Sequence, residues 1–374
     1  MKIYLVGGAV RDKLLGLPIK ERDYVVVGAT VEDMVKLGYR QVGKEFPVFL
    51  HPKTSEEYAL ARMERKVLPG YKGFLFDTSP EVSLESDLVR RDLTINAMAE
   101  DENGKLYDFY HGQRDLEQKI LRHVSPAFKE DPVRILRVGR FLARYHHLGF
   151  HVADETTALM QKMVEAGEVD ALVAERVWKE LERALTEKNP EKFFEVLASC
   201  SALPRLFPEL DLQGQSFAVL HGASDLSPDA VIRFSSLMSL YHADRETAEQ
   251  MADKICDRYR APNEYRELSK LTIRHYPSAL KSRKLSAKEL LHLFNGLDIF
   301  RRERRYHKFL IVCQAIASVQ NVDFNSVFLE QAAQVAKSVN VHELLSKGLK
   351  GQELAETLKE KRTERIAEWL KHQV

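Results

Sequence analysis

The chain has 374 residues, which is too long for one ordinary hydrophobic core and predicts several packed units. Its 44% hydrophobic and 30% charged residues are typical of a folded globular protein and exclude an intrinsically disordered one. The 56 Lys and Arg residues nearly cancel the 55 Asp and Glu residues, so the net charge neither indicates nor excludes a nucleic-acid partner.

Cysteine usage and hydropathy indicate the compartment. Cys200, Cys256 and Cys313 are odd in number and lack metal-type spacing, so we expect buried thiols in a reducing compartment. The first residues, MKIYLVGGAVRDKLLG, lack the apolar core and cleavage site of a signal peptide. No stretch approaches the roughly 20 apolar residues that span a bilayer. We expect a cytoplasmic protein without a membrane partner, as a monomer or a weak dimer.

The first third of the chain predicts an α+β domain. Short β-rich runs alternate with Gly, Pro and charged turns up to about Asp115. Short helices are expected at Val10–Leu15 and Val31–Leu37. The expected strands are Ile3–Val6, Tyr24–Val27, Val48–His51, Tyr58–Ala61 and Leu106–Phe109.

From Pro132 onward, helical periodicity dominates and strand patterns nearly disappear. Asp131 followed by Pro132 is typical of a helix start, with Asp131 as the N-cap. The Gly-, Ser- and Asp-rich stretch Gln213–Pro228 is the best candidate for a loop or a joint between domains. The chain therefore predicts an α+β head followed by an all-helical body.

Two motifs near the N-terminus indicate a nucleotide site and a metal site. In GGAVRD (Gly7–Asp12), two glycines between a strand and a helix expose backbone N–H groups to an anion, beside Arg11; a purely structural turn has the same pattern. Glu21 and Asp23 stand two residues apart at a strand start, so both carboxylates are expected on one face. Such carboxylates repel each other unless a cation lies between them, and their oxygens suit Mg²⁺. A solvated strand start beside Arg22 is the alternative.

The segment Arg90–Ala99 (RRDLTINAMA) allows two interpretations. Asp92 could cap a charged helix start. Alternatively, Arg91 contacts a triphosphate while Asp92 and Asn96 face a ribose.

The segment Glu130–Phe141 carries arginines beside an apolar core face, without regular acidic partners four residues away. This pattern favours phosphate contact or reading of a base edge over a basic surface helix. The arginines that share an arc of roughly 120° are Arg134, Arg137, Arg140 and Arg144.

Taken in order and spacing, GGAVRD, the paired acids, RRDLTINAMA and EDPVRILRVGRFLAR resemble the class II tRNA nucleotidyltransferases, the bacterial CCA-adding enzymes. ERVWKELERAL (Glu175–Leu185) resembles the last motif helix of that family, so the resemblance covers about Met1 to Asn189. It implies a polymerase-β-like nucleotidyltransferase head and then a helical neck, body and tail. The expected segments are 1–130, 131–200, 201–270 and 271–374.

The resemblance also implies roles for residues. Glu21 and Asp23 would hold catalytic Mg²⁺. Asp131 and Arg134, with Glu130, would pair with the base of CTP or ATP, and the segment from Lys66 to Phe74 would form a loop tied to switching between them. The expected nucleotide-binding residues are Gly8, Arg11, Arg91, Asp92, Asn96, Asp131, Arg134, Arg137 and Arg140.

Two features depart from the family pattern. The first acid is Glu21, where Asp is more usual, so the metal geometry must adjust to one more methylene. No motif fixes a third carboxylate, and Glu57 is the candidate. Beyond Asp211 the chain has no His-Asp dipeptide, so we expect no phosphohydrolase site of the kind some longer relatives carry; Tyr241–Asp244 is the nearest remnant.

The predicted function is therefore that of a CCA tRNA nucleotidyltransferase, which adds and repairs the 3′-terminal CCA without a nucleic-acid template and releases pyrophosphate. A poly(A) polymerase, or an enzyme that adds only CC or only A, would share the head motifs. A binding protein with a decayed site is disfavoured by the intact motifs. The tRNA, held by its 3′ end and acceptor arm, is expected to place phosphates on the basic clusters Lys281–Lys284 and Arg301–Arg305 with Lys308, which are otherwise solvated faces.

Overall fold

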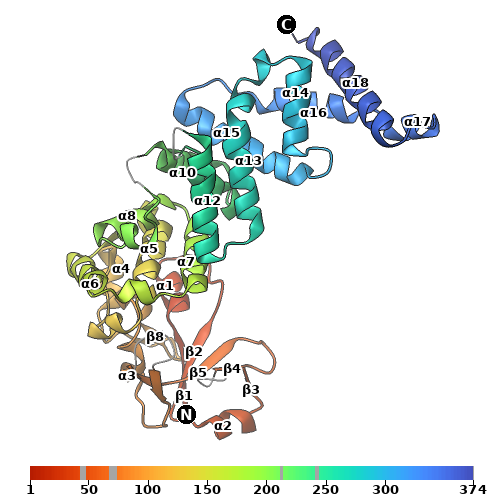
Figure 1. Cartoon of the computed structure of the whole chain (residues 1–374). Coiled ribbons are helices and arrows are strands. Elements are labelled where there is room, and N and C mark those ends of the chain that lie inside the picture. Colours follow the sequence, from red (N-terminus) through yellow and green to blue (C-terminus); the bar gives the residue numbers. More distant parts are fainter. Residues whose placement is uncertain (43–47, 67–73, 211–213, 241–243, 374) are drawn as a thin grey trace. The chain divides into compact units, whose positions relative to one another are not determined.

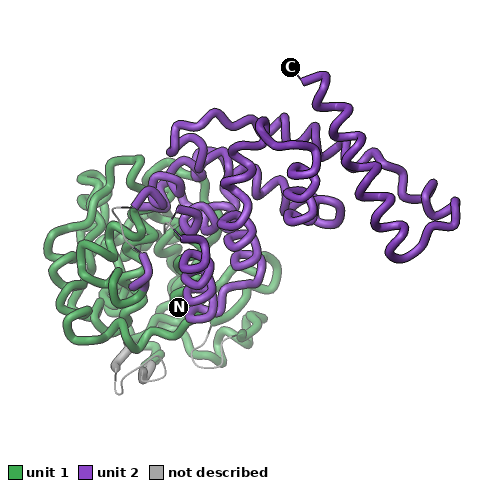
Figure 2. The backbone as a smooth tube through the Cα atoms, turned by 45° about the horizontal axis from the view of Figure 1, so that its top comes forward, with its two compact units in different colours: residues 1–184, 192–206 green, residues 185–191, 207–374 purple. Residues whose placement is uncertain are grey.

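The structure is a computed structural model that describes residues 1–42, 48–66, 74–210, 214–240 and 244–373. The chain divides into two compact units, residues 1–184 with 192–206 and residues 185–191 with 207–374 (Figure 2). Unit 1 contains the strands, whereas the described part of unit 2 is helical (Figure 1). The predicted α+β class with a helical remainder is confirmed. The boundaries of the four expected segments stay a prediction.

A seven-stranded mixed sheet in unit 1 has the order β3–β4–β5–β2–β1–β8–β9. β2 and β5 run parallel, and all other neighbouring strands run antiparallel. The expected strands are confirmed, with ends shifted by no more than two residues. The strands of this sheet are β1 Lys2–Val6, β2 Asp23–Val27, β3 Arg40–Gln41, β4 Val48–Leu50, β5 Glu57–Leu60, β8 Ala99–Glu100 and β9 Leu106–Tyr107.

Two short strand pairs of unit 1 have no counterpart among the expected strands. One is the antiparallel pair of β6 Met63–Lys66 and β7 Phe74–Asp77. The other is the parallel pair of β10 Ile120–Leu121 and β11 His151–Val152. Two residues are too few to give an alternating pattern, so β10 and β11 leave no periodic mark on the sequence.

Neighbouring residues of β2 point to opposite faces of the sheet and enter different cores. Val25 packs in a cluster with Val6 of β1 and Leu88 of helix α3 (Leu84–Leu88). Val26 packs in a second cluster with Met34 of helix α2 (Val31–Lys36). Asp23 shares the face of Val25 because the two residues are two apart, so it lies at the end of the first of these faces.

The helices of unit 1 cover the sheet and extend the unit beyond it. The expected helices at Val10–Leu15 and Val31–Leu37 are confirmed as α1 and α2. The α-helices are α1 Gly8–Leu14, α2 Val31–Lys36, α3 Leu84–Leu88, α4 Gly112–Glu117, α5 Val133–Tyr145, α6 Asp154–Glu165, α7 Ala174–Thr186, whose last residues belong to unit 2, α8 Glu191–Ser199 and α9 Leu203–Leu206. The 3-10 helices are η1 Thr94–Asn96, η2 Pro126–Glu130, η3 His146–Leu148 and η4 Glu168–Ala171.

Unit 2 contains no strand among its described residues, as the sequence predicts. None of its described helices, nor those of unit 1, is long and apolar enough to cross a bilayer. Its elements are α10 Gln215–Leu226, α11 Ala230–Ser239, α12 Arg245–Tyr259, α13 Asn263–Leu280, η5 Ser282–Lys284, α14 Ala287–Leu297, α15 Glu303–Gln320, α16 Ser326–Lys337, α17 Val341–Ser346 and α18 Gly351–Leu370.

The expected loop at Gln213–Pro228 is wrong over most of its length, because α10 occupies Gln215–Leu226. Val219, Leu220 and Ala223 are buried on this helix. Burial of this apolar stripe outweighs the low helix propensity of the Gly and Ser residues that surround it.

A buried arginine ties the end of α7 to α10 within unit 2. The Arg233 guanidinium donates to the carbonyl groups of Leu185 and Glu187 at 2.6 Å, and to those of Ser224 and Ser227 at 2.9 and 2.7 Å. These bonds satisfy carbonyls at two helix ends and explain why residues 185–191 belong to unit 2.

Candidate active site

The turn between β1 and α1 accepts only glycine at its first position. Gly7 has a φ of +70°, and a Cβ there would lie 2.9 Å from Nη1 of Arg91. A Cβ at Gly8 would lie 3.3 Å from Nη2 of Arg11. The backbone N–H of Gly7 donates to the Met98 carbonyl at 3.2 Å. The absence of side chains therefore lets two guanidinium groups approach the turn.

Arg91 reaches this turn with one donor unused. Its Nη2 donates to Oδ2 of Asp87 at 3.3 Å, and its Nη1 donates to the Asn96 carbonyl at 3.5 Å. Its Nε is buried and has no hydrogen-bond partner within the described part of the chain. A buried donor without an acceptor is unfavourable, so this position fits a ligand oxygen. The expected contact of Arg91 with a triphosphate stays a prediction.

The expected metal carboxylates lie at the same end of the sheet. Asp23 is opposite Val6 of β1 and opposite Glu57 of β5 in the strand register. Partial burial raises the pKa of Asp23; the Arg91 guanidinium lowers it and the Glu21 carboxylate raises it again, and the net shift is upward. The ionised form of Asp23 is thus less favoured in the metal-free protein than in a free aspartate.

These carboxylates fit a hard divalent cation. A bound cation would offset the charge repulsion between Glu21 and Asp23 that contributes to the raised pKa of Asp23. Across the described ranges, however, no group of three or more His, Cys, Asp or Glu side chains is arranged to hold a metal. Glu57 therefore lies beside Asp23 in the register but stays a prediction as third ligand.

Arg11 is a buried cross-link in this structure. It is 4% exposed, and its Nε donates to Oδ1 of Asp12 at 2.9 Å while its Nη1 donates to Oδ1 of Asn96. Its guanidinium carbon lies 5.4 and 5.2 Å from the ring centres of Phe141 and Tyr145. The structure thus engages Arg11 with side chains of the protein, and its expected contact with a triphosphate stays a prediction.

Asp92 is a buried junction between η1 and α5. It accepts from Nε of Arg137 at 2.7 Å, from Nδ2 of Asn96 at 3.0 Å and from the Leu93 N–H at 2.8 Å. Burial alone would raise the pKa of Asp92, but the Arg137 guanidinium and the hydrogen bonds hold it well below its usual range. Asp92 therefore orders Arg137 and Asn96, rather than capping a helix.

The other α5 arginines are also anchored by acids from distant segments. Nε of Arg140 donates to Oε2 of Glu180 at 2.6 Å, and Nη1 of Arg137 lies 4.0 Å from the other Glu180 oxygen. Arg144 lies 3.3 Å from Oδ2 of Asp12. The alternative of a merely solvated basic surface is wrong, because Arg140 is only 7% exposed.

The two residues expected to read the base, Asp131 and Arg134, both form hydrogen bonds within the protein. Nη1 and Nη2 of Arg134 donate to the carbonyl groups of Ala127 and Arg90 at 2.8 and 2.6 Å. Oδ1 of Asp131 accepts from the Val133 N–H at 3.2 Å, but the N-cap residue of α5 is Pro132, so the expected cap is displaced by one residue. Both Asp131 oxygens also accept from Arg176, at 3.0 and 2.7 Å. Their contact with a nucleotide base stays a prediction.

Several residues of this network had no role assigned from the sequence. Glu180 interrupts the apolar stripe of α7 between Val177 and Leu181, and a carboxylate in such a stripe indicates a buried ion pair. Asp87 likewise lies between the buried residues Leu84 and Leu88 of α3. No sequence pattern of this kind indicates a role for Arg176, because its partner Asp131 is distant in the sequence.

Two expected features lie outside the described residues. The loop from Lys66 to Phe74 falls mainly on residues 67–73, and His242 falls on residues 241–243.

Comparisons with known proteins identify the family of the chain. Residues 3–122 match the Poly A polymerase head domain, and residues 149–213 match a probable RNA and SrmB-binding site of polymerase A. A CCA-adding enzyme of Pseudomonas putida is 50% identical, and the match covers 97% of each protein. The chain belongs to the CCA-adding enzyme family. A multifunctional CCA protein of Thioalkalivibrio sulfidiphilus is 47% identical, over 99% of this chain and 100% of that protein.

Solved structures of the family share the fold. A CCA-adding enzyme with ATP has a TM-score of 0.72 at 24% identity, covering 98% of this chain and 86% of that one. The Thermotoga maritima CCA-adding enzyme complexed with tRNA has a TM-score of 0.70 at 22% identity, covering 100% and 91%. The predicted resemblance is confirmed. Members of the family are nucleotidyltransferases, which typically require a divalent metal.

Asp23→Asn tests the metal carboxylate. We expect nucleotide addition to fall about 100-fold or more, because a neutral amide is a poor ligand for a hard cation. We also expect the metal-free variant to melt higher than wild type at pH 7. The pKa of Asp23 is raised in the folded state, so ionised Asp23 lowers the free energy of unfolding at pH values above the folded pKa. This loss is absent at pH values below the pKa of Asp23 in the unfolded state. Glu32→Gln on α2 is an exposed control, and normal turnover of Asp23→Asn would contradict the assignment.

Asp92→Asn tests the buried junction. Removing the charge beside Arg137 should destabilise the protein by about 3 kcal/mol at neutral pH. The folded pKa of Asp92 is depressed, so its contribution is present above the unfolded value near 3.9 and is lost as the pH falls through the folded value. Urea titrations at pH 7, 5 and 3 should therefore show a constant deficit that narrows only at pH 3. Glu117→Gln, exposed on α4, is the control; an equal deficit at pH 3 would refute this account.

Proposed function

We propose that this chain rebuilds the 3′-terminal CCA of tRNA from CTP and ATP without a nucleic-acid template. One observation supports this most strongly: the Gly7–Gly8 turn, the unpaired Nε of Arg91 and the Asp23 carboxylate meet at one end of the sheet. Together these groups suit a triphosphate, its counter-charge and a metal. The protein would work in the cytoplasm.

In the proposed reaction, the 3′-hydroxyl oxygen of tRNA attacks the α-phosphorus of a nucleoside triphosphate. The bond between the α-phosphorus and the β-bridging oxygen breaks, and pyrophosphate leaves. Mg²⁺ held by Glu21 and Asp23 would supply charge neutralisation and a lower pKa for the attacking hydroxyl.

The chain's own cations orient the triphosphate. Arg91 offers its buried Nε, and Arg137 keeps its terminal nitrogens on a side chain that is 33% exposed. Asp92 fixes Arg137 through Nε, so the remaining donors are ordered before the ligand arrives. Donors that need no reorganisation stabilise charge in the transition state more effectively than mobile ones.

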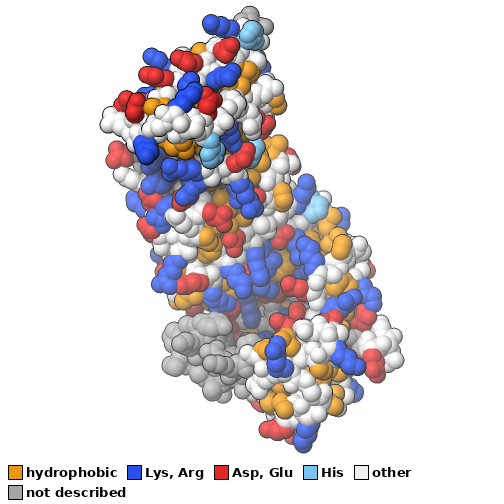
Figure 3. Space-filling model, turned by 90° about the vertical axis from the view of Figure 1, so that its right-hand side faces the viewer, with side chains coloured by type: hydrophobic (Ala, Val, Ile, Leu, Met, Phe, Trp, Pro, Cys, Tyr) orange, Lys and Arg blue, Asp and Glu red, His pale blue; other side chains and the backbone are white. Residues whose placement is uncertain are grey.

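The helical unit offers only part of its positive charge to RNA. Arg302 and Arg305 lie 2.6 and 3.2 Å from Oε2 of Glu267. Lys308 lies 2.8 Å from Asp229. On the face drawn in Figure 3, basic and acidic side chains are likewise interspersed. In the part of the expected clusters that the structure describes, the exposed cations without an ion pair are Lys281, Arg283, Lys284, Arg301 and Arg304.

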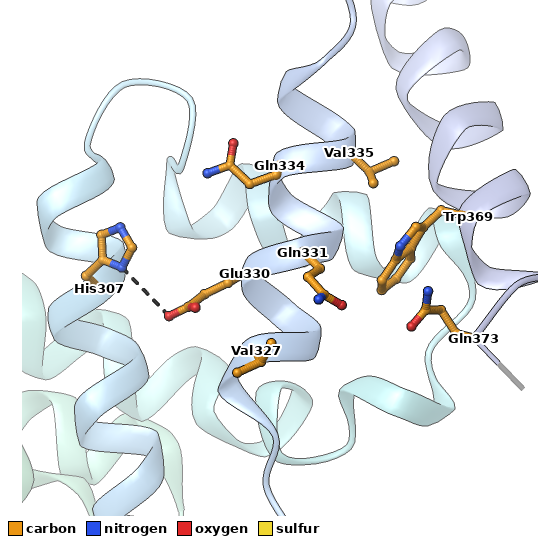
Figure 4. Close-up of a pocket in the computed structure, with 8 residues that line it drawn as sticks. All are labelled: His307, Val327, Glu330, Gln331, Gln334, Val335, Trp369 and Gln373. Atoms are coloured by element: carbon orange, nitrogen blue, oxygen red, sulfur yellow. Dashed lines mark ion pairs between the residues drawn. The ribbon is translucent and has the colours of Figure 1, made fainter.

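A groove of about 560 Å³ in unit 2 supports recognition beyond phosphates (Figure 4). It lies between α15, α16 and the end of α18. The amides of Gln331 and Gln373 line it beside the indole of Trp369, whereas Gln334 points away from the indole. Amides that can pair with a base edge, next to an aromatic ring, suit an unpaired RNA base.

Incorporation assays test the proposed function and its alternatives. The substrate is a tRNA that ends before CCA, incubated with CTP alone, ATP alone and both. Full CCA addition is expected only with both nucleotides. Long A tracts on any RNA would indicate the poly(A) polymerase alternative, and addition stopping after CC, or adding only A, would indicate a partial adder.

Asp131→Ala and Arg134→Ala test base reading. Both should relax the choice of CTP and ATP over UTP and GTP more than they weaken triphosphate binding, because the triphosphate contacts are assigned to other arginines. Loss of the hydrogen bond from the Val133 N–H to Asp131 should also cost about 1 kcal/mol. If UTP and GTP stay excluded while only the melting temperature shifts, these residues are structural.

Salt-dependent tRNA binding tests the helical unit. Lys281→Ala with Lys284→Ala, and Arg301→Ala with Arg304→Ala, should each weaken binding and lower the slope of log affinity against log salt by roughly 1 to 2. Arg302→Ala is the matched control, because Glu267 already neutralises that side chain. A larger effect from the control than from either pair would contradict the assignment.

A further inference from the structure

The structure nearly exhausts the hydrogen-bonding capacity of Asp131. A carboxylate offers about four acceptor positions, two on each oxygen. Oδ1 accepts from the Val133 N–H at 3.2 Å and from Nη1 of Arg176 at 3.0 Å. Oδ2 accepts from Nη2 of Arg176 at 2.7 Å. Three positions are filled, so one position remains, on Oδ2.

Arg176 fixes the direction of that remaining position. Its two terminal nitrogens hold both Asp131 oxygens, so the carboxylate plane cannot rotate without breaking charge-assisted bonds. Arg176 comes from α7, whereas Asp131 precedes α5, so the pair also joins two elements. The two side chains are 28% and 24% exposed, which leaves the remaining acceptor within reach of a ligand.

A single fixed acceptor distinguishes donors from acceptors on a base edge. Cytosine and adenine carry an exocyclic amino group where uracil and guanine carry a carbonyl oxygen. The amino group donates to a carboxylate oxygen, whereas the carbonyl oxygen meets it as a second acceptor and leaves both groups unpaired.

We infer that Arg176 is a positioning residue for base choice: it holds the Asp131 carboxylate so that one acceptor faces the nucleotide. This inference rests on the proposed function and adds to it a residue that touches no substrate itself. Without Arg176, the Asp131 carboxylate rotates, and its free acceptors are no longer restricted to one direction.

Three variants separate this role from a structural one. Arg176→Gln removes the charge and the paired donors. Arg176→Lys keeps the charge but lacks the planar pair of donors. Lys179→Gln removes an exposed charge from the same helix and is the matched control. Each is assayed for kcat/KM with CTP, ATP, UTP and GTP on tRNA ending before CCA, alongside a thermal melt.

We expect discrimination against UTP and GTP to fall about 10-fold or more in Arg176→Gln, which corresponds to about 1.4 kcal/mol. Arg176→Lys should not restore it, and Lys179→Gln should behave as wild type. In an Asp131→Ala background, Arg176→Gln should cause no further loss of discrimination, because the residue acts through Asp131.

An equal loss of kcat/KM with all four nucleotides would overturn the inference. A lower melting temperature with unchanged discrimination between nucleotides would also overturn it. If Arg176→Gln does not fold, Arg176→Lys gives the same decision, since full discrimination by that variant excludes a need for the paired donors.

Failure of the wild type to add C and A defeats the proposed function itself. Unchanged discrimination in Asp131→Ala defeats base reading at Asp131, whereas its loss there but not in Arg176→Gln defeats only the role of Arg176.

Discussion

The pairing of arginines on α5 with acids from distant segments is the constraint on which the rest of unit 1 depends. Arg137 is bound to Asp92, Arg140 to Glu180 and Arg144 to Asp12. A buried guanidinium without acceptors is costly, so α5 packs where α1, α7 and the residue Asp92 before η1 supply these acids. Positions of α1, η1 and α7 around α5 are thereby specified by charge as well as by apolar packing.

The same ion pairs orient the arginine side chains of the site before a charged ligand binds. Because Asp92 and Glu180 bind Nε atoms, the guanidinium planes of Arg137 and Arg140 are fixed before any nucleotide arrives. At the sheet end the balance is opposite, since partial burial and the nearby Glu21 carboxylate raise the pKa of Asp23. A cation for the carboxylates and an anion for the arginines thus complement each other, which is the charge distribution of a nucleotide–metal complex.

Unit 2 uses charge differently. Its arginines and lysines in the expected RNA-binding clusters are partly neutralised by Glu267, Asp229 and Glu264. Such pairs order the side chains and reduce the net positive field. Recognition of duplex RNA by shape requires a few well-placed cations rather than a uniformly basic surface.

The sequence by itself determined the local structure. Short β-rich apolar runs predicted the β1 and β2 strands, Asp131 followed by Pro132 predicted the start of α5, and the order of motifs predicted the family. These features depend on contacts between residues close in the chain, which a pattern records directly. The two-residue strands β10 and β11 and the helix α10 escaped, because their stability comes from tertiary pairing and burial.

Only the tertiary structure decided how the site's charges are used. The arginines of α5 showed no acidic partners four residues away, and this observation is correct, but their partners lie about 40 residues or more distant in the chain. Likewise, Arg11 and Arg134 carry the charge expected of phosphate or base contacts, yet the fold buries them on Asp12, Asn96 and backbone carbonyls. A sequence pattern reports which charges exist, whereas long-range packing decides which of them remain available to a ligand.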